Sequence, residues 1–189
     1  MSYVLGFSRC LLALVFLASA AGKLRGRAAF PAFADSLRAM DLLPGRAVVP
    51  VAAVVVAAEA AVPVLLVPLP VAAVSTVGFA LATALLAAFT VTVAVVLRRG
   101  TPASCRCFGE AAAAPFGRHH LVRNVALTVV AGTGGYASIA APGTTIWTIV
   151  LCVPLAVVGA LVVLRLDDIV ALFRPVTPVA GTTSRRAAR

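Results

Sequence analysis

Residues 47–67 read AVVPVAAVVVAAEAAVPVLLV, an apolar stretch in which Glu59 is the only charged residue. A helix of about 20 apolar residues is long enough to cross the hydrocarbon core of a bilayer, because each residue adds about 1.5 Å of rise. The stretch has neither the alternation of a half-buried strand nor the polar face of a surface helix. It therefore predicts a transmembrane helix.

Four more apolar blocks of similar length occur in the chain. Of its 189 residues 62% are hydrophobic and only 12% are charged, with a mean hydropathy of +1.08, and a water-soluble domain could not bury this much apolar side chain. The sequence therefore predicts an all-α integral membrane protein, with a bundle of about five transmembrane helices in residues 1–165. The predicted spans are 3–22, 47–67, 71–97, 120–141 and 144–164.

Breaks in the apolar pattern define the connections and the ends. Prolines in 68–70 and the Pro-Gly pair at 142–143 predict two tight hairpins. Residues 166–189 are basic and rich in Pro, Gly, Ser and Thr, which predicts a disordered tail. As an alternative, the first block could be a cleaved signal peptide, since 18–20 reads Ala-Ser-Ala. Against this, no Lys precedes the block and Arg9 lies inside it.

The basic residues, which give the chain a net charge of +10, predict its orientation in the membrane. Nearly all of them fall between the first and second spans, around the connection of the third and fourth, or after the fifth, and five spans place these three segments on one side. The positive-inside rule assigns that side to the cytoplasm of a bacterial inner membrane and leaves the N-terminus outside. The charge therefore indicates contact with anionic lipid and not nucleic-acid binding.

Cys105 and Cys107, separated by Arg106 in the connection between the third and fourth spans, are the strongest candidates for chemistry. A disulfide across a one-residue gap closes a strained ring, and strained exposed disulfides are the labile, oxidising ones. The positive charge of Arg106 favours the thiolate, which is the attacking species. The pair is therefore predicted to be a redox pair, with Arg106 stabilising its thiolates.

Two other interpretations of these cysteines stay open. They could be free thiols with no shared role, because cysteine is also a common small hydrophobe. With His119 and His120 they could bind a metal, but structural zinc sites separate each ligand pair by two or more residues, so no metal is expected.

Cys10 and Cys152 each lie about eight residues into spans that start on the same side of the membrane, so they reach similar depths. They could meet if the first and fifth spans pack together, and they would then accept electrons from the Cys105/Cys107 pair or form a structural bond. The alternative is that both are ordinary core cysteines.

Glu59 needs a partner or a proton, because an uncompensated carboxylate inside a membrane costs at least a few kcal/mol. Arg9 enters from the opposite side to nearly the same estimated depth. A structural Arg9–Glu59 ion pair across the first two spans is therefore predicted, and a proton relay is the alternative.

Several short motifs, in order and spacing, resemble those of a known family. They are Arg9, Ala21-Gly22-Lys23-Leu24, Leu43-Pro44, Glu59, Phe89-Thr90, Arg99-Gly100, Cys105-Arg106-Cys107-Phe108-Gly109 and Arg123-Asn124. Over residues 3–164 the chain resembles the MauE family of methylamine-utilisation membrane proteins, which are related to DoxX-like proteins. The resemblance implies a four-helix DoxX-like core plus one helix. It also implies a role with a thioredoxin-like partner in processing, transport or maturation of an exported, disulfide-rich client such as the small subunit of methylamine dehydrogenase.

The chain departs from the family pattern at Arg106, where Gly is expected, and it lacks the Cys-x-x-Cys of vitamin K epoxide reductase-like bundles. The leading hypothesis is a membrane thiol–disulfide relay or maturation factor, an oxidoreductase if it has enzymatic activity. A transporter with a midplane Glu59/Arg9 site and a scaffold without chemistry are the alternatives. No cofactor is evident, and a quinone is possible but unsupported by any pattern.

The predicted orientation conflicts with this function, since exported proteins mature outside while the charges place Cys105 and Cys107 inside. Either these thiols collect electrons in the cytoplasm and thiols nearer the outer face, such as Cys10 and Cys152, deliver them, or the number of spans is wrong.

Overall fold

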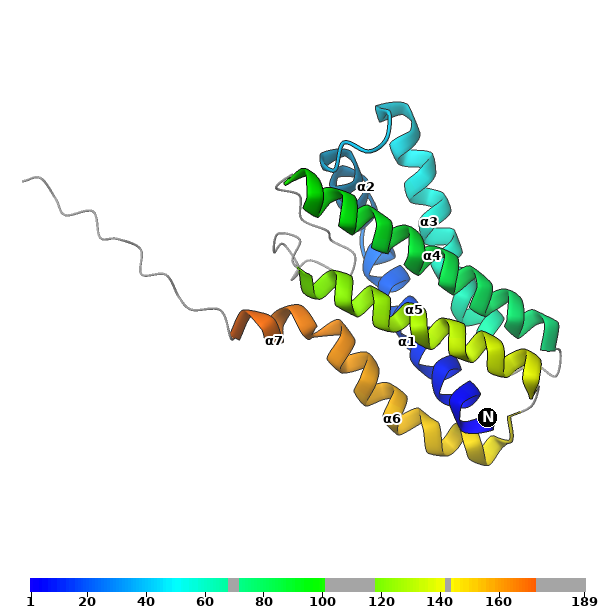
Figure 1. The fold of residues 1–189 in the computed structure, drawn as a ribbon. Helices are drawn as coiled ribbons and strands as arrows, with labels where there is room; N and C mark the ends of the chain where they lie inside the picture. Colours follow the sequence, from blue (N-terminus) through cyan, green and yellow to red (C-terminus); the bar gives the residue numbers. More distant parts are fainter. Residues whose placement is uncertain (68–71, 101–117, 142–143, 173–189) are drawn as a thin grey trace, which may run out of the picture.

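The computed structural model describes residues 1–67, 72–100, 118–141 and 144–172, and within these ranges the chain is helical with no strand (Figure 1). The predicted all-α membrane bundle is confirmed. The helices are α1 (Ser2–Leu24), α2 (Ala29–Ala39), α3 (Gly45–Leu66), α4 (Ala72–Arg99), α5 (Arg118–Ala140), α6 (Ile146–Leu164) and α7 (Leu166–Leu172).

Helix α1 is the centre of the bundle. It packs against α3, α5 and α6, while α4 packs against α3 and α5 on the side away from α6 (Figure 1). Of the most apolar 18-residue stretch of α1, 56% is buried inside the protein, compared with 22–28% of the corresponding stretches of α3, α4 and α6. The main core joins α1 side chains such as Leu12 and Phe16 to Val62, Phe79 and Leu127 from the surrounding helices. The outer helices therefore leave most of their apolar surface facing lipid.

Length and hydropathy identify four membrane-spanning helices among the described residues: α1, α3, α4 and α6. Helix α5, the fourth predicted span, has 23 residues but is less apolar, because it begins with Arg118, His119 and His120 and contains several Gly and Thr residues. Helices α4 and α6 run in the same direction, so the chain must return between them, and α5 makes that return alongside α4 (Figure 1). The described residues thus contain five long helices, of which four are long and apolar enough to cross a membrane, where the sequence had predicted about five spans.

The sequence predicted no helix between the first two spans, but this segment contains the amphipathic helix α2. Phe30, Phe33, Ala34 and Leu37 recur at helical spacing, and they pack against the first turns of α3. Helix α2 therefore covers one end of the bundle.

The bundle was predicted to end at residue 165, but the chain continues past this residue as the short helix α7. The sequence had predicted disorder for residues 166–172, and this prediction is wrong because these residues form a helix. The rest of the predicted tail lies outside the described residues.

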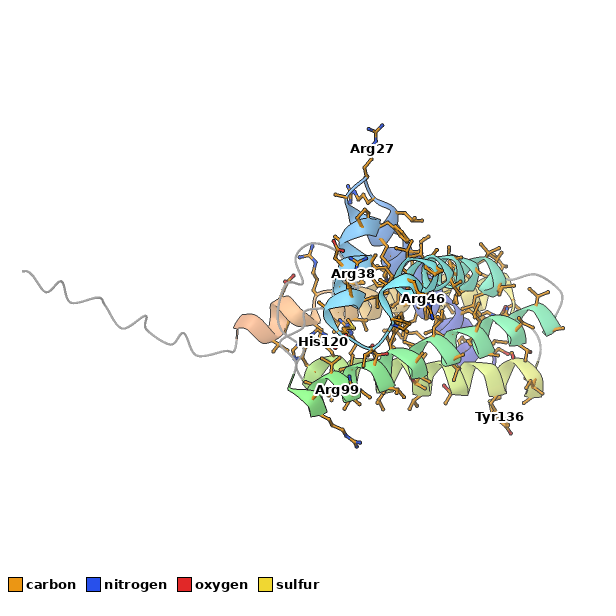
Figure 2. The ribbon with its side chains drawn as sticks, turned by 90° about the horizontal axis from the view of Figure 1, so that it is seen from above. Arg27, Arg38, Arg46, Arg99, His120 and Tyr136 are labelled. Atoms are coloured by element: carbon orange, nitrogen blue, oxygen red, sulfur yellow. The ribbon has the colours of Figure 1, made fainter. Side chains whose placement is uncertain are left out.

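Basic side chains gather at the end of the bundle where α2 lies. Arg27, Arg38, Arg46 and Arg99 all lie toward this end, and Tyr136 lies toward the opposite one (Figure 2). We call the first the basic end and the second the Arg9 end, because Arg9 lies near the N-terminus of α1. The helix ends that flank the two long connections thus lie at one end of the bundle. The assignment of this end to the cytoplasm stays a prediction.

Helix α5 approaches α1 and α4 closely at one glycine. A Cβ built on Gly134 would lie 2.4 Å from Cε1 of Phe79 and 2.7 Å from the Cβ of Ser8, whereas a Cβ on Gly132 meets nothing within 4 Å. Membrane helices often associate through such small residues, because the hydrophobic effect does not drive them together in lipid.

We predict that Gly134→Ala destabilises the bundle by about 1–3 kcal/mol, since Phe79 and Ser8 must move. Gly132→Ala is the matched control and should be neutral or stabilising by up to about 1 kcal/mol, because alanine is the better helix former. The free energies of unfolding can be compared by denaturant titration in detergent micelles with circular dichroism. Equal effects of the two substitutions would contradict the close packing at Gly134.

Candidate functional site

A buried ion pair lies where α1, α2 and α3 meet. Lys23 Nζ donates to both carboxylate oxygens of Glu59, at 2.8 Å to Oε1 and 2.7 Å to Oε2, and each residue is only 1% exposed. Ser19 donates to Glu59 Oε1 at 3.2 Å, and the ring of Phe33 from α2 lies 4.8 Å from Lys23 Nζ. The carboxylate is therefore neutralised and hydrogen-bonded without reaching water.

The predicted Arg9–Glu59 pair is wrong. The prediction required the first two spans to begin at common membrane planes, whereas the first turns of α3 pack on α2. This offset brings Glu59 to the C-terminal end of α1, where Lys23 lies. Lys23 had been counted only as a loop charge. Lys23 could have been identified as a partner of Glu59 from its position directly after the first apolar block. A long lysine side chain there can turn back into the bundle.

Arg9 instead ties three segments together at the Arg9 end. Its Nη2 donates to Ser75 Oγ at 2.6 Å, and its Nη1 donates to Thr144 Oγ1 at 3.1 Å, so α1 is joined to the beginning of α4 and to the residues before α6. Its Nε has no partner among the described residues. The guanidinium is satisfied largely by hydroxyl groups, with no carboxylate among its hydrogen-bond partners.

A cavity of about 260 Å³ lies beside the ion pair at the basic end. Helices α1 to α5 all contribute to its walls, and α2 covers it through Phe33 and Leu37. Most of its surface is apolar side chain, from residues such as Phe16 and Phe89. This combination of apolar walls and a few polar groups is typical of small-molecule sites.

The polar groups of the cavity come from two sides. Glu59 and Ser19 lie on one side, and His120, Arg123 and Asn124 enter from the first turns of α5. Arg123 Nη2 lies 3.4 Å from His120 Nδ1, and these three α5 residues are all buried. His120 lies in the first turn of α5 and is buried in the cavity wall.

Cys105, Arg106 and Cys107 lie outside the described residues. The segment that contains them leaves α4 after Gly100 and enters α5 at Arg118, and both helix ends lie at the basic end (Figure 1). The redox pair thus stays a prediction. Among the described residues no group of three or more His, Cys, Asp or Glu side chains could hold a metal ion.

Cys10 and Cys152 lie in helices that pack together, as the matched-depth argument required, and both are free thiols. The Sγ of Cys152 lies 3.6 Å from the carbonyl oxygen of Tyr3, and a Cβ on Gly6 would lie 3.4 Å from it. Both cysteines belong to the Arg9 end. Cys10 is thirteen positions before Lys23, which corresponds to about 20 Å along a helix axis.

We predict that Glu59→Leu or Lys23→Met alone destabilises the protein by about 3–5 kcal/mol, because each leaves a buried charge without its partner. The double substitution should recover most of this loss, and the coupling can be measured as a double-mutant cycle in detergent. Asp35→Ala is the control, because the Asp35–Arg38 pair is exposed and should contribute less than about 1 kcal/mol. Additive losses at Lys23 and Glu59 would contradict a coupled pair.

Comparison with known proteins identifies the family of this chain. Residues 1–137 match the family model described as methylamine utilisation protein MauE, and every residue that lines the cavity falls within this range, whereas Cys152 falls outside it. No curated protein and no solved structure matches the chain. Because the match covers well over half of the 189 residues, the chain belongs to the MauE family.

Proposed function

We propose that this MauE-family membrane protein is a thiol–disulfide relay or maturation factor, in which Cys105 and Cys107 are the redox pair. Its client would be an exported disulfide-containing protein, such as the small subunit of methylamine dehydrogenase, handled together with a thioredoxin-like partner. The observation that carries the proposal is that both helix ends flanking this segment lie at the basic end, where the ligand-sized cavity lies.

The chemistry is thiol–disulfide exchange. A thiolate of the reduced partner attacks one sulfur of the Cys105–Cys107 disulfide and releases the other sulfur as a thiolate. The partner's second thiolate then attacks the mixed disulfide, so that the partner is oxidised to a disulfide and the pair is reduced by two electrons to two thiols. The strain of a one-residue gap makes this disulfide easy to reopen, which suits a relay better than a permanent bond.

The positive charge at the basic end supports a cytoplasmic location of the pair. Exchange requires contact between sulfur atoms, and Cys10 and Cys152 lie at the Arg9 end of the bundle. A direct transfer of electrons from the loop pair to these two thiols therefore finds no support in the described helices. The transporter hypothesis is weakened as well, because Arg9 and Glu59 lie in separate clusters and do not form one midplane site.

We predict that Cys105→Ser with Cys107→Ser abolishes accumulation of the mature client in membranes of a producing strain. Cys10→Ser with Cys152→Ser is the matched control and should leave maturation largely intact. A scaffold would tolerate both double substitutions, so normal maturation in the Cys105/Cys107 variant would exclude the redox function.

We further predict that Arg106→Gln slows alkylation of Cys105 and Cys107 at neutral pH, because removal of the cation lowers the fraction of thiolate. Arg106→Lys retains the charge and should react like the wild-type protein. A membrane-impermeant maleimide applied to intact and to inverted vesicles measures rate and side together. Preferential labelling of these cysteines from the outside would reverse the proposed orientation.

A further inference from the structure

The cavity at the basic end has an unused hydrogen-bonding group in its wall. Asn124 is 6% exposed and lines the cavity, and its carboxamide has no hydrogen-bond partner among the described residues. Thr92, on α4, lines the same cavity and makes no hydrogen bond to the described part of the chain, in contrast to Thr90, which donates to the carbonyl oxygen of Leu86. Both groups can therefore form hydrogen bonds with a molecule that enters the cavity.

The dimensions and composition of the cavity restrict this molecule. Its volume of about 260 Å³ is below the range of about 300–1,000 Å³ that is usual for drug-sized ligands, so the bound part is of the size of a single substituted ring. The walls are apolar, and the site lies among membrane-spanning helices, so the ligand must be soluble in lipid. The amide of Asn124 and the hydroxyl of Thr92 can both donate to a carbonyl oxygen.

A relay also needs a carrier at this end of the molecule. Cys10 lies about 20 Å along the axis of α1 from Lys23 at the basic end, too far for exchange by contact at that end. A lipid-soluble two-electron carrier would bind where the thiol segment enters α5, because His120 and Asn124 lie in the first turns of that helix.

We propose that this cavity binds the ring of a membrane quinone through Asn124 and Thr92. The inference rests on the proposed redox function and names its electron acceptor. Two electrons and two protons pass from the two thiols to the quinone, a sulfur–sulfur bond forms, and the two ring carbonyls become the hydroxyls of the quinol.

The test is equilibrium binding of decylubiquinone to the purified full-length chain in nanodiscs, measured by dialysis. Ala88→Phe places a ring at the cavity wall, and Asn124→Leu removes the amide at similar volume. Each should weaken binding at least tenfold. Ala87→Phe is the matched control, since Ala87 is also exposed on α4 but does not line this cavity, and it should bind like the wild-type protein.

Thermal unfolding of each variant shows whether a loss of binding reflects misfolding, and Thr92→Val then serves as a second, milder variant that should weaken binding severalfold. Absence of saturable binding, equal loss in Ala87→Phe and Ala88→Phe, or equal binding of decylbenzene, which has no carbonyl, would each overturn the quinone site.

The Cys105→Ser/Cys107→Ser variant separates this inference from the proposed function. It should bind decylubiquinone normally and fail to reduce it, whereas unchanged reduction in this variant would overturn the thiol relay and its assigned acceptor.

Discussion

The ion pair between Lys23 and Glu59 is the interaction on which the arrangement of the basic end depends. Lipid offers no water to a carboxylate in the middle of α3, so Glu59 must meet a cation inside the bundle. Lys23 lies on the last turn of α1, and it reaches Glu59 only if α3 is displaced along α1. The displaced first turns of α3 then need another partner, and α2 packs against them through Phe33 and Ala34. One buried charge is thus linked to the offset of two helices and the position of a third.

The two ends of the bundle satisfy their buried charges in different ways. At the Arg9 end a guanidinium is held by the hydroxyls of Ser75 and Thr144, and the helices pack closely through small residues such as Gly6 and Gly134. At the basic end Lys23 and Glu59 neutralise each other in a buried ion pair, and a cavity of about 260 Å³ lies beside it. Close packing at one end and an apolar cavity at the other separate a structural region from a region that can bind a ligand.

This division bears on the chemistry of the cysteines. Cys10 and Cys152 belong to the tightly packed end, where Cys152 contacts the backbone of Tyr3 and the position of Gly6. Cys105 and Cys107 lie in sequence between α4 and α5, whose flanking ends both lie at the basic end. Under the proposed function, the Cys105/Cys107 pair would pass its electrons to a quinone bound in the cavity, whereas Cys10 and Cys152 would serve packing.

The sequence by itself determined the solvent of this protein and the positions of its long helices, because apolar blocks of about 20 residues have few alternatives to spanning a bilayer. It also determined that Glu59 must be compensated and that the chain resembles the MauE family. The sequence could not determine which cation meets Glu59, because depth counted from the ends of spans ignores the offset between α1 and α3. It could not determine the cavity either, because Asn124, Thr92 and Glu59 are 32 to 65 residues apart and their convergence exists only once five helices have packed. Partner choice and cavities depend on how helices are displaced and rotated against one another, and only tertiary packing sets those two quantities.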